Sequence, residues 1–384
     1  MADKKHKQLP KGKTTGFHLV SIGTFSGLPL VKYIFDLFHS LGETHVVQCT
    51  MGNFHNYLQQ ANTHQTVLHF PTNKEFNSQG TSHKIKKYLK VFSNVLFDGS
   101  TRACYYTIDL FTLALLIFLK KVRVKRNAVI VYHQFELIEP QQLNRLDSFF
   151  LKYISKNLKQ LNLAVFPEEN RMNYFKSLVN TPDDTDYLLI PNSNDNDFGN
   201  TQQPGSGKTV VGHIGAVGLG HYIHSFMEAV KDLPQDQYDV LFIGSLQQEV
   251  IDLISGYNLT NVKLIGQIPH NELSSYYETI DIGVILYKDI GLNYRFCAPN
   301  KLYEYWSHGI PVVAHELPGL TSVFADPMEG KLVDMTEPST IVQALMNQSV
   351  SVDNRKALNE MFKRKHHIAQ YLELLKQRLQ IEHE

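Results

Sequence analysis

The clearest fold signal in the chain is the stretch CAPNKLYEYWSHGIPVVAHELPG, residues 297–319. Pro299 can begin a helix, because its missing N–H costs nothing in the first turn. Gly309 and Pro311 end that helix, and the β-branched run IPVVAH that follows is typical of a strand. A helix that leads directly into a short apolar strand indicates a parallel sheet with helical crossovers.

The same alternation of strand and helix runs through both halves of the chain. The strand-like runs are GFHLVSIG (16–23), NAVIVYHQF (127–135), LNLAVFPEE (161–169), DYLLIPN (186–192), TVVGHIG (209–215), YDVLFIG (238–244), NVKLIGQI (261–268), IDIGVILY (280–287) and IPVVAHE (310–316). The sequence therefore predicts an α/β protein of two doubly wound Rossmann-like domains that face each other across a cleft. Ligands of such sheets bind beyond the carboxyl ends of the strands.

Composition places the domain boundaries. The chain has 384 residues, which is too long for one ordinary core. The Asn-, Asp- and Gly-rich residues 193–207 are typical of a linker. We therefore predict an N-terminal domain at 1–192 and a C-terminal domain at 208–360. Residues 361–384 have helical spacing and can pack back on the N-terminal domain.

The three cysteines and the N-terminus indicate a cytoplasmic protein. Cys49, Cys104 and Cys297 are odd in number and have no metal-binding spacing, which favours a reducing compartment. The first residues, MADKKHKQLPKGK, lack the apolar core of a signal peptide. No metal site, cofactor or nucleic-acid partner is expected.

The sequence GSGKT, residues 205–209, resembles the end of a nucleotide-binding phosphate loop. Such a loop needs a preceding strand, a glycine at position 202 and a helix beginning at the Lys-Thr pair. Position 202 is Gln, turn-forming residues precede the motif, and the strand-like VVGHIG follows it. GSGKT is therefore predicted to be linker.

Two segments could hold a phosphorylated ligand. In VVGHIGAVGLGHYIHSF, the glycines let the backbone approach a ligand, and a helix starting near His221 offers free N–H groups. In the helix of 299–308, Lys301 and Glu304 share one face. The lysine suits an anionic oxygen and the carboxylate suits a ribose diol. The alternatives are a simple tight turn and a surface ion pair.

The order GHIGAVG, FIGS, LIGQIPHNELSSYYETIDIGVILY and APNKLYEYWSHGIPVVA resembles the donor-binding domain of the glycosyltransferase family 4 group. These enzymes have the B-type fold of two Rossmann-like domains. The N-terminal runs VSIGTFSG, VIVYHQFE, LAVFPEENR and YLLIPN occur in the order that the family has. The resemblance covers about 20 to 335, and it implies that the N-terminal domain binds the acceptor and the C-terminal domain a nucleotide sugar.

The resemblance also implies roles for individual residues. Glu304 would bind the ribose hydroxyls, and His133 would point at the donor sugar and orient it, with catalysis helped by the departing phosphate. The other implied positions are Asn300 and Lys301 near the diphosphate, Gln267 and Ile268 at the base, Gly215 along the phosphates, and Gly23 and Gly27 in the acceptor-side loop.

Two positions depart from the family pattern. Many members carry a glutamate beside the donor sugar where this chain has Phe296. The basic residue that commonly follows the glycine loop is missing, with His221 nearby, so that Arg295 or Lys301 is left to supply charge for the phosphates.

The resulting prediction is a glycosyltransferase that moves a sugar from a nucleotide-diphosphate sugar to a glycan or lipid-linked acceptor. Retention at the anomeric carbon, no metal ion and a role in surface polysaccharide or glycoconjugate synthesis are expected. The alternatives are a nucleotide-sugar 2-epimerase of the same fold and an inactive nucleotide-sugar-binding scaffold, the latter suggested by Phe296.

Charge suggests a contact with membranes. Residues 1–190 carry 23 Lys and Arg against 14 Asp and Glu, a net +9. The apolar run LFTLALLIFL, residues 110–119, is flanked by HKIKKYLK and KKVRVKR; it is too short to span a bilayer, which takes about 20 residues. We predict that residues 84–126 form a basic, partly apolar surface that docks reversibly on anionic lipid at the inner face of the membrane. The alternative is that LFTLALLIFL is a buried helix and the lysines are solvated.

Overall fold

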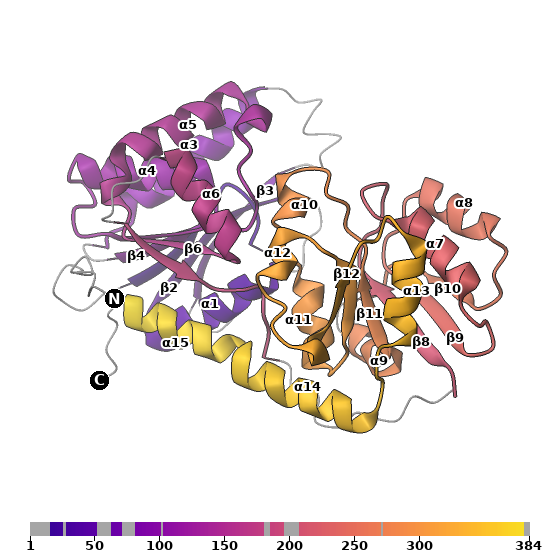
Figure 1. Ribbon diagram of the computed structural model, residues 1–384. Coiled ribbons are helices and arrows are strands. Elements are labelled where there is room, and N and C mark those ends of the chain that lie inside the picture. Colours follow the sequence, from indigo (N-terminus) through magenta and orange to yellow (C-terminus); the bar gives the residue numbers. More distant parts are fainter. Residues whose placement is uncertain are drawn as a thin grey trace. The chain divides into compact units, whose positions relative to one another are not determined.

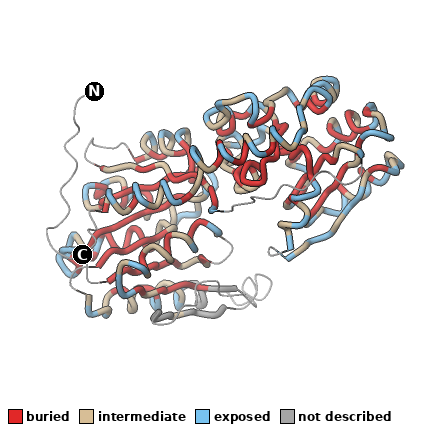
Figure 2. Tube along the Cα trace, turned by 90° about the horizontal axis from the view of Figure 1, so that it is seen from below, coloured by how far each residue is buried: buried red, intermediate tan, exposed pale blue. Residues whose placement is uncertain are grey.

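The computed structural model describes residues 16–25, 28–51, 63–70, 81–100, 103–179, 185–195, 207–269 and 272–379. The chain forms two compact units, one of Met1–Pro191 with Ile368–Glu384 and one of Asn192–His367. Each unit is an open α/β sheet with helices on both faces (Figure 1). The buried residues concentrate along the strands and on the helix faces that cover them (Figure 2).

The sheet of the first unit has seven parallel strands in the order β3-β2-β1-β4-β5-β6-β7. Their bounds are β1 Gly16–Val20, β2 Thr44–Met51, β3 Thr63–Phe70, β4 Ala103–Thr107, β5 Val129–His133, β6 Leu163–Phe166 and β7 Asp186–Leu189. The helices are α1 Pro29–Leu41, α3 Thr81–Phe97, α4 Leu110–Lys121, α5 Arg145–Asn157, α6 Glu169–Val179 and α15 Ile368–Arg378. One apolar cluster contains residues of α3 to α6 and another contains residues of α1 and α15, so the helices cover both faces.

The apolar run LFTLALLIFL is α4, and it is a buried helix of this sheet. Asp109 begins it by accepting the Thr112 N–H at 2.8 Å. Leu113 to Ile117 are all buried in the core. Lys120 Nζ donates to Asn162 Oδ1 at 2.6 Å and Lys121 Nζ donates to Asn157 Oδ1 at 2.7 Å. The helix α4 is therefore a buried helix of the sheet, as the alternative stated, and the membrane contact of residues 84–126 stays a prediction.

The sheet of the second unit has six parallel strands in the order β10-β9-β8-β11-β12-β13. Their bounds are β8 Thr209–Ile214, β9 Tyr238–Ile243, β10 Val262–Ile265, β11 Ile282–Ile285, β12 Val312–His315 and β13 Gly330–Val333. The helices are α7 Ile223–Asp232, α8 Gln248–Gly256, α9 Leu273–Thr279, α10 Leu292–Arg295, α11 Asn300–Ser307, α12 Pro318–Thr321, α13 Pro338–Met346 and α14 Val352–Lys365. Residues of α7, α8 and α13 cover one face, and residues of α9, α11 and α14 cover the other.

The helix α11 ends where the sequence predicts it to end. Pro299 occupies the N-cap position, and the helix stops at Ser307. Gly309 follows with φ +68°, and a Cβ there would come within 2.2 Å of the Arg355 carbonyl oxygen. Only glycine fits this left-handed position. The turn delivers the chain directly into β12.

The C-terminal helical stretch is divided between the units. The helix α14 packs against α11 in the second unit and ends at Lys365. From Ile368 onward the chain belongs to the first unit, where Ile368 and Leu375 of α15 join the apolar cluster that contains α1. The sequence predicts a C-terminal segment that begins at residue 361. In the structure, residues 361–367 belong to the second unit, and the part that packs on the first unit begins at Ile368.

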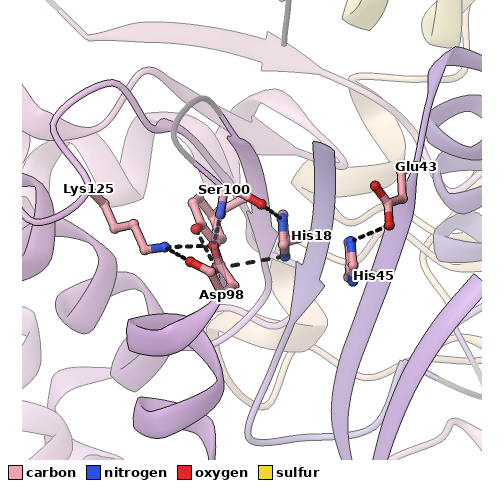
Figure 3. A network of polar contacts seen from close by, with 7 residues as sticks. His18, Glu43, His45, Asp98, Ser100 and Lys125 are labelled. Carbon is pink, nitrogen blue, oxygen red and sulfur yellow. Dashed lines mark hydrogen bonds and ion pairs between the residues drawn. The ribbon is translucent and has the colours of Figure 1, made fainter. Parts of the chain in front are cut away.

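A buried polar network lies near the amino ends of the first unit's strands (Figure 3). Asp98 accepts from Lys125 Nζ at 2.6 Å and from the Tyr105 hydroxyl at 2.5 Å. His18 Nε2 lies 3.0 Å from Ser100 Oγ, but its Nδ1 is 3.9 Å from Asp98 Oδ2. Serine, histidine and aspartate are therefore not linked by the hydrogen bonds of a catalytic triad. Burial lowers the pKa of His18 to about 4, which fits a neutral structural histidine.

Candidate active site

The candidate site lies at the carboxyl ends of β8 and β11. The strand order reverses between these two strands, and ligands of open α/β sheets bind at such a switch point. Two backbone hydrogen bonds tie the loops that leave the two strands. Tyr222 N–H donates to the Leu286 carbonyl at 2.7 Å, and Lys288 N–H donates to the Gly220 carbonyl at 3.0 Å. The loop of residues 215–220 is therefore held beside the end of β11.

Gly215 makes the turn at the end of β8. Its φ is +120°, and its N–H donates to the Ile243 carbonyl at 2.8 Å. A Cβ at this position would lie 3.0 Å from Lys301 Nζ. The backbone conformation requires glycine here, and the lysine lies close above it. The ammonium of α11 and the glycine turn predicted to line the phosphates are thus brought together.

Lys301 is held over this turn by uncharged partners. Its Nζ lies 3.2 Å from His213 Nε2 and 5.3 Å from the centre of the Tyr287 ring. Burial lowers the pKa of Lys301 to about 8, opposed by the nearby Glu304 and Cys297. At pH 7 the ammonium is charged and poorly hydrated, which suits it to binding an anionic oxygen.

His213 is neutral and its tautomer is fixed. Its Nδ1 lies 3.1 Å from the Val284 carbonyl, which can only accept, so Nδ1 carries the proton. Burial, and next the charge of Lys301, hold the pKa of His213 well below its usual value. Nε2 therefore offers a lone pair to the Lys301 ammonium.

Glu304 is oriented by a different partner. The Tyr277 hydroxyl donates to Glu304 Oε2 at 2.5 Å. The Tyr277 ring stacks on His308 with centroids 4.4 Å apart, and His308 Nδ1 lies 2.7 Å from the Glu304 carbonyl. Among the interactions of the described residues, there is no ion pair between Lys301 and Glu304. The alternative of a simple surface ion pair is therefore wrong, since each side chain has a separate partner.

The other predicted donor-site residues lie at the carboxyl edge of the same sheet. Among the described residues, they have no hydrogen bond or ion pair with the side chain of Lys301 or Glu304. Asn300 is the first residue of α11, Gln267 is exposed directly after β10, and Ile268 packs at the border of the apolar cluster. Arg295 pairs with Asp289 at 3.5 Å on the surface. Phe296 follows α10, is half-buried and supplies no carboxylate. The structure thus brings Gly215 and Lys301 into contact but not Arg295.

His221 stands in the glycine loop where the family has a basic residue nearby. Burial, and next the charge of Lys301, lower the pKa of His221 to about 4. Its ring lies 5.2 Å from that of Tyr287 and 5.8 Å from that of His213. His221 is therefore neutral near pH 7 and adds no positive charge to the site.

In the first unit, His133 ends β5 and is fully buried. Its Nδ1 lies 2.8 Å from the Tyr106 hydroxyl, and its ring stacks on Phe135 at 4.1 Å. Burial lowers the pKa of His133 to about 3, and Nε2 has no hydrogen-bond partner among the described residues. A neutral ring with one free nitrogen can orient a hydroxyl but cannot serve as an acid at pH 7.

The acceptor-side loop follows β1. Gly23 N–H donates to Ser21 Oγ at 2.8 Å, and Cys49 N–H donates to the Gly23 carbonyl at 3.1 Å. These bonds fix Gly23 beside β2. Gly27 lies outside the described residues.

Within the described part of the chain, no group of three or more His, Cys, Asp or Glu side chains is placed to hold a metal ion. No helix among those residues is long and apolar enough to cross a membrane.

Lys208 of the GSGKT motif lies at the wrong end of its strand for phosphate binding. It precedes β8, whereas Gly215 follows it, and its Nζ donates to the Gln235 carbonyl at 3.0 Å and to Asp239 at 3.2 Å. We expect Lys208→Ala to change nucleotide-sugar affinity by less than about twofold, because this half-buried side chain lies at the opposite end of β8 from Gly215. Titration of both proteins with the same nucleotide sugar tests this. A hundredfold loss would restore the phosphate-loop interpretation.

The sequence alone did not point to His213 or Tyr277. A histidine inside the apolar strand TVVGHIG, directly before the Gly215 turn, is the one signal for His213. Tyr277 lies in a polar helical segment, and nothing in its neighbourhood relates it to Glu304.

Comparisons with known proteins agree with this geometry. Residues 208–348 match the protein family described as Glycosyl transferases group 1. HepE of Anabaena, solved with UDP and glucose, is 15% identical with a TM-score of 0.68, covering 96% of this chain and 99% of that one. Sucrose-phosphate synthase from Thermosynechococcus elongatus is 15% identical with a TM-score of 0.65, covering 94% and 98%. The α,α-trehalose-phosphate synthase (UDP-forming) of Burkholderia vietnamiensis is 11% identical with a TM-score of 0.65, covering 96% and 98%.

Among curated protein sequences, none matches this chain. The structural similarities extend over both units, and the family match covers the unit that holds the glycine turn and α11. Residues 208–348 therefore belong to the group 1 glycosyltransferases, and the chain has the two-domain B-type fold.

Proposed function

We propose that this glycosyltransferase uses a UDP-sugar as donor and transfers the sugar to a hydroxyl of a glycan or lipid-linked acceptor. The transfer retains the anomeric configuration, needs no metal ion and serves the synthesis of surface polysaccharides or glycoconjugates. The observation that carries the donor part is the separate holding of Lys301 by His213 and of Glu304 by Tyr277. A cation over a glycine turn and a carboxylate one helical turn away match a diphosphate joined to a ribose.

The positive groups of the site stabilise the nucleotide diphosphate as it leaves. In the reaction a bond forms between the acceptor oxygen and the anomeric carbon, and the bond from that carbon to the phosphate oxygen breaks. The departing phosphate oxygen takes the acceptor proton. Lys301 and the first N–H groups of α11 stabilise the negative charge that develops on the phosphate. His133 offers its free Nε2 to one hydroxyl of the sugar and holds it in place.

Thermal unfolding in the presence of UDP-, GDP-, ADP- and CDP-sugars tests the donor. A ligand at 100 times its dissociation constant stabilises the protein by about 2.7 kcal/mol. We expect UDP-sugars to raise the unfolding temperature most and UDP to be released slowly by hydrolysis. No shift with any of the four classes would contradict nucleotide-sugar binding.

Product analysis separates the two alternatives. A 2-epimerase would convert the nucleotide sugar with no acceptor added, whereas a transferase releases UDP faster when an acceptor is present. An inactive scaffold would bind the nucleotide sugar and release no UDP at all. The absence of a carboxylate at Phe296 is the feature that suggests the inactive scaffold.

Exposed apolar side chains on the first unit support the proposed membrane contact and, with it, a lipid-linked acceptor. The side chains of Ile85 and Leu89 on α3 are 52% and 60% exposed, and Phe149 on α5 is 59% exposed. Lys86 and Lys90 are exposed on the same helix α3. Exposed apolar side chains next to lysines are typical of a helix that binds the surface of anionic membranes. This surface of α3 and α5 replaces the buried α4 as the candidate docking surface.

The surface lies toward the catalytic edge of its own sheet. Both α3 and α5 follow strands and run antiparallel to them, so their first turns are near the carboxyl ends of the strands. Packing of Tyr88 on Phe111 at 4.3 Å and of Phe111 on Phe150 at 5.4 Å shows that α3, α4 and α5 are adjacent. An acceptor headgroup at a docked membrane would be near the edge that carries His133.

Vesicle flotation tests this contact. We expect the protein to float with vesicles containing anionic lipid at low salt and to be released at high salt, because each lysine contributes about 1 kcal/mol. Lys86→Glu combined with Lys90→Glu should abolish flotation. The matched control is Lys263→Glu with Lys331→Glu in the second unit. If the wild type stays unbound at low salt, the acceptor is reached without this surface.

A further inference from the structure

We propose that His213 is a positioning residue for the donor's diphosphate, because its Nε2 holds the Lys301 ammonium over the Gly215 turn and away from Glu304. This inference rests on the proposed function of the same site. It assigns a role to a strand residue that touches the ligand only through Lys301.

The position of His213 is fixed by its surroundings. It lies on the central strand β8, paired in register with Phe242 of β9, and its side chain is buried. Its Nδ1 proton is bonded to the Val284 carbonyl of β11 at 3.1 Å. The position of Nε2 is therefore fixed relative to the sheet. The Lys301 ammonium, whose Nζ lies 3.2 Å from Nε2, is held at a fixed position as well.

A neutral acceptor is what this position needs. A carboxylate at the same place would hold the ammonium equally well, but it would cancel the charge that a phosphate requires. The lone pair of a neutral imidazole orients the ammonium and leaves its full positive charge available. Two further N–H groups of the ammonium remain for ligand oxygens.

Loss of His213 would give Lys301 another partner. Glu304 lies three residues later on the same face of α11, and its negative charge raises the pKa of Lys301 against the effect of burial. An ion pair at this spacing is favourable in helices. It would withdraw the lysine from the phosphate position, while the Tyr277 hydroxyl still holds the Glu304 carboxylate at the ribose position. His213 on one side and Tyr277 on the other keep the two charged groups apart.

Two isosteric substitutions separate positioning from packing. His213→Asn retains a donor for the Val284 carbonyl but is too short to reach Lys301, whereas His213→Gln extends to the place of Nε2. We expect His213→Asn to weaken UDP binding by about tenfold or more, which corresponds to about 1.4 kcal/mol. Uridine, which lacks phosphates, should bind within about twofold of wild type. His213→Gln should recover most of the affinity for UDP.

A double-mutant cycle with Lys301→Met gives the decisive measurement. If His213 acts through Lys301, His213→Asn should change UDP affinity by less than about twofold once the lysine is gone. His18→Asn, at another buried neutral histidine, controls for loss of a histidine and should leave the ratio of UDP to uridine affinity unchanged. Thermal unfolding of each variant reports its fold.

The outcomes distinguish this inference from the proposed function. Failure of the wild type to bind UDP contradicts the proposed donor. Binding of UDP by the wild type with equal losses for UDP and uridine in His213→Asn, or additive effects in the cycle, contradicts the role of His213 alone. If His213→Asn does not fold, His213→Gln is measured alone. A UDP affinity close to that of the wild type supports the inference, and a tenfold loss of UDP affinity in a folded His213→Gln protein overturns it.

Discussion

Replacement of Lys301 by methionine is expected to lower kcat/KM for sugar transfer by about 100- to 1,000-fold, the range found when one preorganised donor to a developing oxyanion is removed. Methionine lacks the charge and is only one atom shorter, and an apolar group beside the Tyr287 ring is expected to preserve the fold. Steady-state kinetics with saturating acceptor measures the loss. UDP affinity should fall with it, while uridine affinity should not.

The pH dependence gives a second measure of the same residue. The pKa of Lys301 is about 8 in the free protein, and a bound diphosphate favours the charged form. Affinity for UDP should therefore be full below pH 8 and fall as the pH rises through it. Lys301→Met should remove this alkaline decline. Lys231→Met, at an exposed lysine near the end of α7, is the matched control and should behave as wild type. An unchanged pH profile in Lys301→Met would assign the diphosphate to another cation.

Glu304→Gln is expected to weaken binding of UDP and of uridine alike, by roughly 1.5 to 3 kcal/mol, because a charged acceptor of hydroxyl donors is replaced by a neutral one. The equal effect on nucleoside and nucleotide distinguishes the ribose site from the phosphate site. Isothermal titration with both ligands makes the comparison.

The matched control is Glu228→Gln. Glu228 accepts from the Tyr257 hydroxyl at 2.8 Å on the helix pair α7 and α8, which repeats the Tyr277–Glu304 contact away from the site. Glu228→Gln should leave the affinities for UDP and for uridine unchanged. Unaltered uridine affinity in a folded Glu304→Gln protein would place the ribose elsewhere.

Local signals were enough for the strands of the second unit and for the site-bearing helix. Pro299 at the N-cap, Gly309 at φ +68° and the apolar run of β12 each act within a few residues of their own position. The same holds for the Gly215 turn, whose conformation is required by the backbone and by one close neighbour. Fold class and the approximate donor site could therefore be predicted.

Four strands were not predicted from the sequence, and their residue composition explains why. The strands β2 and β3 mix polar and apolar side chains, as in THVVQCTM and THQTVLHF, and lack the continuous apolar run typical of a buried parallel strand. The strand β4 reads ACYYT, and β13 is the four residues GKLV. The strand β4 pairs with the distant β1, and the edge strands β3 and β13 each pair with one neighbour, so hydrogen bonding within the sheet and not a local apolar pattern makes them strands.

The sequence by itself determined the alternation of strands and helices, the glycine turn at Gly215 and the shared helical face of Lys301 and Glu304, because these depend on neighbouring residues along the chain. The tertiary structure alone decided that α4 is buried and that Lys301 pairs with His213, 88 positions away in sequence, while Glu304 pairs with Tyr277. The physical reason is that a side chain takes the partner that the strand order and helix packing place beside it, and that order arises from long-range contacts.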